Sequence, residues 1–349
     1  MSNFNSPLPI ESFSDNMKAA IGSSNIIDLK QLIRREPPQK GTSHWVQSYR
    51  AKGSWDSTTG TWISQEALSR PAGAIPRRQW EALAESNKTF DAWRKRLTPH
   101  QDIDFYMSLC DKDDIETGHE FESLDELEMN NDPTSAIMQE LAKGFIVKGN
   151  SKVIAALKSA TTTRKMLDLT ASSSTFGNVK QVSEAWATNN PKCEFTTTNV
   201  GYFSLVDDAP LLEADMEACA VPHGATKIVL INPYDAAMMK TKSFDKFTSK
   251  DFPFVSKKDI TNGYGGLPDL FGFSFVVSTQ VAKGEMLAFV PECMTLVPYK
   301  DLTQALDYDI TIRNHLVYYA NEQWGVVCND DRGRFKIKVK AAAESNTGV

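Results

Sequence analysis

The pattern that most constrains this chain is a long amphipathic helix predicted over residues 132–160. Asp132 is a favoured N-cap residue, and Pro133 suits the first helical position because its fixed φ already matches a helix. Apolar residues then recur at helical spacing: Ile137, Met138, Leu141, Phe145, Val153, Ile154 and Leu157. At 1.5 Å per residue such a helix is about 40 Å long. Its apolar stripe predicts a packing face and not a cofactor site.

Shorter patterns predict the elements around this helix. A strand is expected at residues 102–109, and residues 165–262 mix strands with helices. In that stretch Leu205, Ala209, Leu212, Met216 and Ala220 would line one helix face, with a strand at 227–231 and a short helix at 232–239. The last part is β-rich, with strands expected at 270–277, 286–290, 334–340, and as a pair at 315–320 and 324–328.

Aromatic residues gather in a stretch that is otherwise rich in Gly, Ser and Thr. Trp45, Trp55, Trp62 and Trp80 are four of the seven tryptophans, and Tyr49 lies among them. Residues 53–62 read as a β-hairpin with its turn at 56–60. Because an isolated hairpin is barely stable in water, these side chains need another surface. That surface is either a small core within the same chain or a neighbouring subunit, where tryptophan and arginine are favoured contact residues.

Charged residues are strongly segregated. Arg77, Arg78, Arg94, Lys95 and Arg96 form the densest basic group. Residues 111–132 carry ten acidic side chains, among them Asp111, Asp113 and Asp114, against Lys112 alone. A solvated acidic loop is one interpretation of this segment, pairing with the basic group is a second, and a metal site is a third. The alternate ligands and central glycine of a calcium loop are absent.

Composition excludes several classes of protein. The chain has 349 residues, enough for a sizeable core, and its net charge of −6 opposes binding of nucleic acid over the whole surface. No apolar run approaches the roughly 18 residues of a membrane helix. The five cysteines are widely spaced and contain no Cys-x-x-Cys pair, which disfavours a disulfide scaffold or a structural zinc site.

Enzyme motifs are missing from the sequence. It contains no P-loop, no Gly-x-Ser-x-Gly elbow and no His-Glu-x-x-His pair. The glycine-rich residues 262–266 lead into Leu267 and Pro268, and not into a helix that would hold a phosphate. No catalytic, cofactor-binding or metal-binding residue is therefore assigned, and no cofactor is expected.

The order of these pieces resembles tailed-bacteriophage major capsid proteins of the Hong Kong 97 type. Residues 93–96, 102–104 and 111–114 resemble the strand region before the long helix of that family. The run Asn131-Asp-Pro-Thr-Ser-Ala136, the apolar end at 153–157 and the small residues at 159–163 resemble its spine helix and the linker that follows. Residues 211–215, 221–222 and 229–233 resemble the axial-domain helix, strand and Asn-Pro turn. Residues 270–274 and a closing hairpin at 322–339 resemble the returning strands.

This resemblance implies an α+β subunit divided along the chain. It implies an N-terminal arm (1–40), an extended hairpin loop (41–80), a peripheral domain with the spine helix (81–164), an axial domain (165–268) and returning strands that complete both domains (269–349). The extended loop would lie across a neighbouring subunit. The resulting candidate interface residues are Trp45, Tyr49, Trp55, Trp62, Arg77, Arg78, Arg94, Arg96, Asp111, Asp113 and Asp114.

The family also implies a function without catalysis. The chain would be the coat protein that forms hexamers and pentamers of itself and closes into the icosahedral head around the phage's double-stranded DNA. Its expected partners are other copies, a portal, a separate scaffolding protein and a decoration protein, with DNA close by but not specifically bound and no membrane. It would be assembled in the cytoplasm of the host bacterium and reside in the virion. The alternatives are a head decoration or tail component, or the shell of an encapsulin-like compartment.

Overall fold

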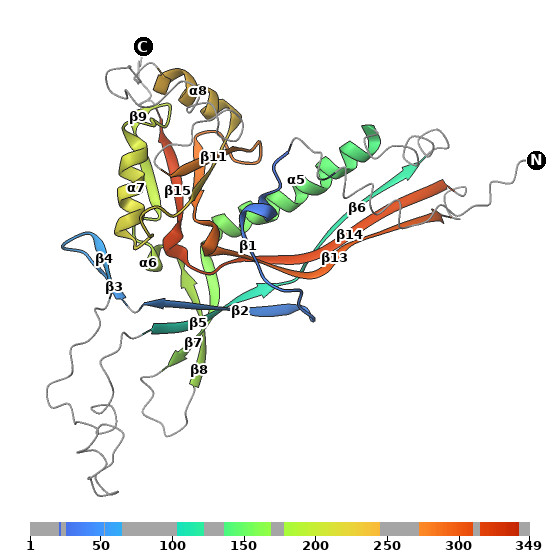
Figure 1. Cartoon of the computed structure of the whole chain (residues 1–349), viewed down its shortest axis with the longest axis horizontal. Helices are drawn as coiled ribbons and strands as arrows, with labels where there is room; N and C mark the ends of the chain where they lie inside the picture. Colours follow the sequence, from blue (N-terminus) through green and yellow to red (C-terminus); the bar gives the residue numbers. More distant parts are fainter. Residues whose placement is uncertain are drawn as a thin grey trace, which may run out of the picture.

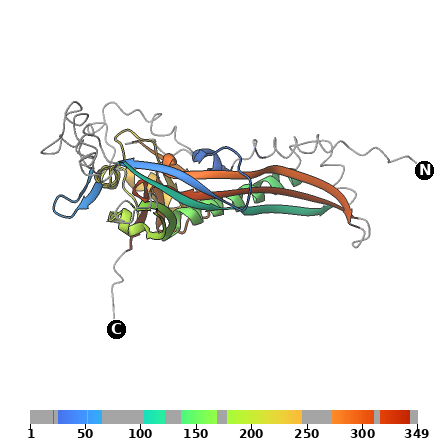
Figure 2. The same cartoon turned by 90° about the horizontal axis from the view of Figure 1, so that it is seen from below.

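The structure, a computed structural model, describes residues 21, 26–51, 53–64, 103–121, 136–168, 178–244, 272–309 and 315–341. Four sheets and a long helix organise these residues (Figure 1). Turned by 90°, the described part is long and thin (Figure 2). No helix among the described residues has the length and apolar character needed to cross a membrane.

The longest sheet forms an extended arm and has the strand order β1-β13-β14-β6 (Figure 1). Its strands are β1 (Arg34–Arg35), β13 (Met294–Asp309), β14 (His315–Cys328) and β6 (Asp113–Phe121). The last three pair antiparallel, whereas β1 pairs in parallel with β13 just after a 3₁₀ turn, η1 (Leu29–Leu32). The segment before β2 is thereby fixed to the edge of β13.

Helix α5 (Ala136–Lys158) lies along this sheet and is the predicted long helix. Its buried residues are Ala142, Phe145, Ile146, Val153, Ile154 and Leu157, which repeat at the spacing of one helix face. All of them except Ile146 pack on Ile115 of β6 and Trp324 of β14 within one core. Gly149 faces that indole, since a Cβ built on it would lie 3.5 Å from the Trp324 ring. The predicted cap, Asp132 and Pro133, lies outside the described residues.

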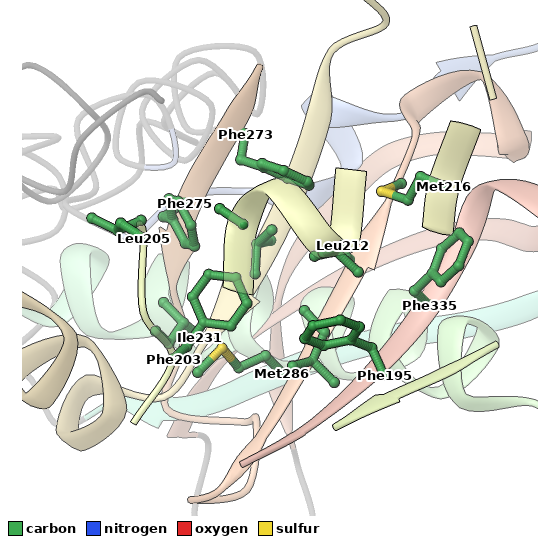
Figure 3. Packing of buried hydrophobic residues seen from close by; sticks show 14 of the residues in the cluster. Phe195, Phe203, Leu205, Leu212, Met216, Ile231, Phe273, Phe275, Met286 and Phe335 are labelled. Carbon is green, nitrogen blue, oxygen red and sulfur yellow. The ribbon is translucent and has the colours of Figure 1, made fainter. Parts of the chain in front are cut away.

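A second sheet has the order β11-β10-β12-β15-β9 and carries the other large core. Its strands are β9 (Glu194–Val200), β10 (Lys227–Ile231), β11 (Phe273–Val277), β12 (Glu285–Phe289) and β15 (Arg334–Lys340). The helices beside it are α7 (Asp208–Ala218) and α8 (Pro233–Phe244). Side chains from the sheet and from α7, among them Leu212, Phe275 and Phe335, point into one apolar cluster (Figure 3).

A third sheet, with the order β2-β5-β7-β8, lies on the other side of the arm's base. Its strands are β2 (Ser43–Ala51), β5 (Ile103–Asp111), β7 (Thr161–Asp168) and β8 (Asn178–Ala185), the last leading into the short helix α6 (Trp186–Asn189). The fourth sheet is a hairpin of β3 (Gly53–Asp56) and β4 (Thr61–Ser64). The 3₁₀ turns η5 (Pro291–Cys293) and η6 (Asp331–Gly333) flank β13 and β15.

Several sequence-based predictions of elements are confirmed. The hairpin at 53–62, the strands at 102–109, 227–231 and 286–290, and the helix after Asn232 are all present. Strand β15 buries Phe335 and Ile337 and leaves Lys338 and Lys340 exposed, as its alternation predicts.

Other predictions are wrong. Residues 113–121 of the acidic segment form β6 and not a solvated loop, because their backbone pairs with β14 throughout. Residues 315–320 and 324–328 are one strand, β14, and not a pair. Residues 322–339 do not form a hairpin either, since β14 and β15 belong to different sheets. Finally, Ala220 is exposed beyond the end of α7, and the supposed linker at 159–163 already begins β7.

Candidate functional site

The sheets and the spine helix meet at a buried charged cluster, which we call the junction: Arg164, Glu184, Asp331 and Arg334. Arg334 opens β15 and is 1% exposed. Its Nη1 donates to the carbonyl oxygens of Ala156 (3.2 Å) and Leu157 (3.0 Å) at the end of α5. A cation at that position satisfies helix carbonyls that have no intrahelical partner. Its Nη2 donates to Asp331 at 2.7 Å, so one side chain ties the spine helix to η6.

Arg164 of β7 approaches the same aspartate from the opposite direction. Its guanidinium pairs with Asp331 at 3.0 Å and with Glu184 of β8 at 2.5 Å, and it lies 5.1 Å from the ring centroid of Tyr106. Burial disfavours the charged guanidinium, but Asp331 and Glu184 outweigh it and raise the pKa of Arg164. The guanidinium of Arg164 therefore stays charged in the interior. Removal of one of its carboxylate partners would leave part of this buried charge uncompensated.

Two asparagines complete the junction. Asn190 donates from Nδ2 to the carbonyl oxygens of Asp331 (3.1 Å) and Arg334 (2.9 Å), and Asn189 donates to the Asp331 carboxylate at 3.2 Å. The ring of Trp186 lies 4.3 Å from the Arg334 guanidinium carbon. Strands of two sheets and the spine helix are thus held by directed polar contacts, which suit a rigid frame.

The tryptophan hairpin packs beside this junction. Trp55 and Trp62 are directly opposite each other in β3 and β4. The guanidinium carbon of Arg332 lies 5.2 Å from the centroid of the Trp62 ring, and Trp55 packs against the core of the second sheet. Trp45 of β2 has the Lys165 ammonium 4.0 Å from its centroid. Each of these three indoles therefore contacts its own chain while staying partly exposed.

An open groove of about 970 Å³ lies between the segment before β2, β2 itself, the end of α7 and the two 3₁₀ turns. Its lining includes Trp45, Tyr49, Pro222 and Arg332. The Tyr49 side chain is 68% exposed, and Ile63 on the neighbouring hairpin is 50% exposed. The face that carries the groove therefore presents aromatic and aliphatic surface to solvent.

The charged residues singled out from the sequence are only partly described. Arg77, Arg78, Arg94 and Arg96 lie outside the described residues. Asp113 pairs with Lys152 of α5, and Lys148 of the same helix donates to the Glu116 carbonyl oxygen at 3.3 Å. Asp111 and Asp114 lie exposed at neighbouring ends of β5 and β6. The acidic strand β6 is therefore partly neutralised by lysines of α5.

Sequence reasoning missed the junction. Asp331 lies in a segment, residues 329–333, that the sequence predicts as a turn. Arg334 begins the predicted strand 334–340, whose alternation draws attention to its lysines instead. Arg164 follows three threonines without any pattern that marks it. An arginine that begins a strand three residues after Asp331 was the available signal, but its helix partners, Ala156 and Leu157, lie far away in the sequence.

The chain was compared with known proteins at three levels. No family model and no curated protein matches its sequence. Many solved structures match its fold, among them those of two phages. The capsid structure of the cyanophage P-SCSP1u is 12% identical with a TM-score of 0.50, over 89% of this chain and 87% of that one. A structure of Mycobacterium phage Che8 is also 12% identical with a TM-score of 0.50, over 88% of this chain and 89% of that one.

These matches span nearly the whole of each chain. At 12% identity they establish the fold and leave the function to be argued from it. The Hong Kong 97-type prediction is confirmed at that level: the chain has the α+β fold of a tailed-phage capsid protein.

Proposed function

We propose that this protein is a major capsid protein, which assembles through hexamers and pentamers into the icosahedral head that encloses phage DNA. The observation that carries the proposal is the fold match to a phage capsid structure over 89% of the chain. In this role the protein is structural and not catalytic, and it resides in the virion after assembly in the host cytoplasm. A portal, a separate scaffolding protein and a decoration protein are its proposed partners.

The shape of the subunit supports this role. The described part is a thin plate (Figure 2), and thin plates tile a shell. The junction holds two sheets and the spine helix in a fixed relation, so that contacts at one end of the plate set the geometry at the other. Heterologous contacts between such plates close into rings when the rotation between neighbours allows it.

The proposed contact surface is the face around the tryptophan hairpin. Trp45, Tyr49, Trp55 and Trp62 are the described aromatic members of the predicted interface, and all four retain exposed area. The in-chain contacts of the three indoles hold these rings in place, which lowers the entropy lost when a neighbour covers them. Charge pairs between subunits would fix the register of this contact. The candidates for such pairs are Asp111, Asp113 and Asp114 with the arginines at 77, 78, 94 and 96.

Electron microscopy of the purified protein tests the proposal. Negative-stain images and light scattering should show closed shells, or rings of five and six subunits. If the isolated protein stays monomeric, coexpression with the head proteins of its phage should produce shells that contain it. A protein that remains monomeric and is absent from particles under both conditions is not a major capsid protein.

A further inference from the structure

Two glutamates and a histidine converge beyond the charged junction, at the end of α7. Glu213 and Glu217 are one helical turn apart and therefore share a face of the helix. His223 follows in the loop, and one ligand atom from each of the three side chains lies within 4.8 Å of the other two. The His223 Nδ1 atom contacts Glu217 Oε1 directly. We call this set the Glu-Glu-His cluster.

The backbone fixes the position of the histidine. Ala220 has φ of +63°, and its N–H donates to the Glu217 carbonyl oxygen at 2.8 Å. The N–H of Val221 donates to the Met216 carbonyl oxygen at 3.1 Å, which completes a Schellman motif. This motif is usually built on glycine, and here an alanine takes the left-handed conformation. With Val221 buried, the chain reverses and brings His223 back over the last turn of α7.

The charges around the cluster favour a dication. Lys227 of β10 is fully buried, and its Nζ lies 2.6 Å from Glu213 Oε1. This contact orients the Glu213 carboxylate and leaves its second oxygen for another ligand. A histidine binds a metal ion only when it is deprotonated. In that form, with both glutamates ionised and Lys227 protonated, the four side chains carry a net charge of −1. His223 is largely exposed, so that an ion and its water ligands can reach the cluster from solvent.

The donor set matches a particular class of ion. One imidazole nitrogen and two carboxylate oxygens, with a position left for water, are ligands that zinc accepts in a tetrahedral site. Imidazole favours Zn²⁺ and its transition-metal neighbours over Ca²⁺ and Mg²⁺, which prefer oxygen ligands alone. We propose that the Glu-Glu-His cluster binds one divalent transition-metal ion of the zinc type. This site is independent of the proposed role in the capsid.

Metal titration of the untagged, full-length protein tests the site. Calorimetry with Zn²⁺ and visible absorption with Co²⁺ should each show one equivalent bound per chain, and Co²⁺ should give the band of a low-symmetry, four- or five-coordinate ion. His223→Gln and Glu217→Gln should each weaken binding by roughly tenfold or more, since even residues that only support a ligand contribute about that much. His44→Gln, the same change on β2, is the matched control and should bind as the parent does.

Other outcomes overturn the proposal. Absence of saturable binding by either ion would exclude the site. So would equal affinity in the parent and in His223→Gln, because the bound ion would then lie elsewhere on the chain. Circular dichroism of both cluster variants should match the parent spectrum, since His223 and Glu217 are exposed and their replacement leaves the cores intact. None of these readouts depends on whether shells form.

Discussion

Gly325 in β14 lies directly against Asp111 in β5: a Cβ built on this glycine would be 2.2 Å from the Asp111 carbonyl oxygen and 2.6 Å from Cys110 Sγ. The arm and the third sheet cross at this contact, and a side chain would force their backbones apart. We expect Gly325→Ala to lower the free energy of unfolding by about 3 kcal/mol, at the upper end of overpacking effects. Urea denaturation of the unassembled protein measures it.

Gly144 provides the matched control for that substitution. It lies exposed within α5, and a Cβ built on it meets no atom within 4 Å. Gly144→Ala should therefore stabilise the protein by about 0.5–1 kcal/mol, through a smaller loss of backbone entropy on folding. Equal effects of the two substitutions would show that the sheets do not touch at Gly325.

Replacement of Arg334 tests the junction. Arg334→Gln leaves Asp331, which is fully buried, with one of its two arginines, and it uncaps the carbonyl groups at the end of α5. We expect a loss of about 3–5 kcal/mol in the free energy of unfolding, as for other broken buried pairs. Hydrogen exchange should also quicken in the last turn of α5.

A surface pair on the same strand serves as the comparison. Lys338 pairs with Glu194 at 2.6 Å, but both side chains are about half exposed. Lys338→Ala should cost less than about 1 kcal/mol, because solvent screens such pairs. If Arg334→Gln lowers the free energy of unfolding by no more than Lys338→Ala does, the role assigned to the junction is contradicted.

The thiols should differ sharply in reactivity. Burial raises the pKa of Cys110, Cys219 and Cys328 to about 12 and that of Cys293 well above its usual value of 9.0. Cys193 is the partly exposed thiol, and burial raises its pKa less. At pH 8 a disulfide reagent should label one thiol per native chain and five after unfolding. Cys193→Ser should remove the native reaction, whereas several fast thiols would refute the described burial.

His223 should titrate above its ordinary value of 6.5 in the metal-free protein. The hydrogen bond that the protonated imidazole donates to Glu217, together with the charge of that carboxylate, raises the pKa of His223. The contribution of this pair to stability is thus complete below pH 6.5 and disappears as the pH rises through the folded-state pKa. Proton NMR of the imidazole gives the midpoint, and Glu217→Gln should lower it. A parent midpoint at or below 6.5 would show that the two side chains do not interact in solution.

The contact surface can be tested at Tyr49. Because Tyr49 is 68% exposed, Tyr49→Ala should change the free energy of unfolding by less than about 0.5 kcal/mol. If Tyr49 contacts a neighbouring subunit, the Tyr49→Ala protein should need at least a tenfold higher concentration to assemble than the parent. A tenfold rise corresponds to a loss of about 1.4 kcal/mol in the free energy of association. Tyr234→Ala, at an equally exposed tyrosine on α8, is the control. Equal effects of both changes would contradict the assignment.

The sequence predicted elements whose side chains alone determine them. Helix α5 was predictable because its buried residues repeat at helical spacing. Strand β10 was predictable because four apolar residues in a row, 228–231, follow Lys227, and all five of its residues are buried. Strand β6 was missed because Ile115 is its only apolar residue between Asp113 and Gly118, so that backbone pairing with β14 defines it. β14 was divided in two because Glu322 and Gln323 interrupt its apolar pattern. The junction depends on residues such as Arg164 and Asp331, which only the tertiary fold brings together.

The contact between Arg334 and the end of α5 also has a consequence for synthesis. The two partners are 177 residues apart, so the spine helix leaves the ribosome long before its cap has been translated. Strand β14 likewise pairs with a distant segment, β6, which is translated some two hundred residues earlier. Contacts of such long range make folding slow and late. A chain interrupted before β15 lacks the arginine that fixes helix to sheet, so that incomplete products are kept from adopting the finished shape of the subunit.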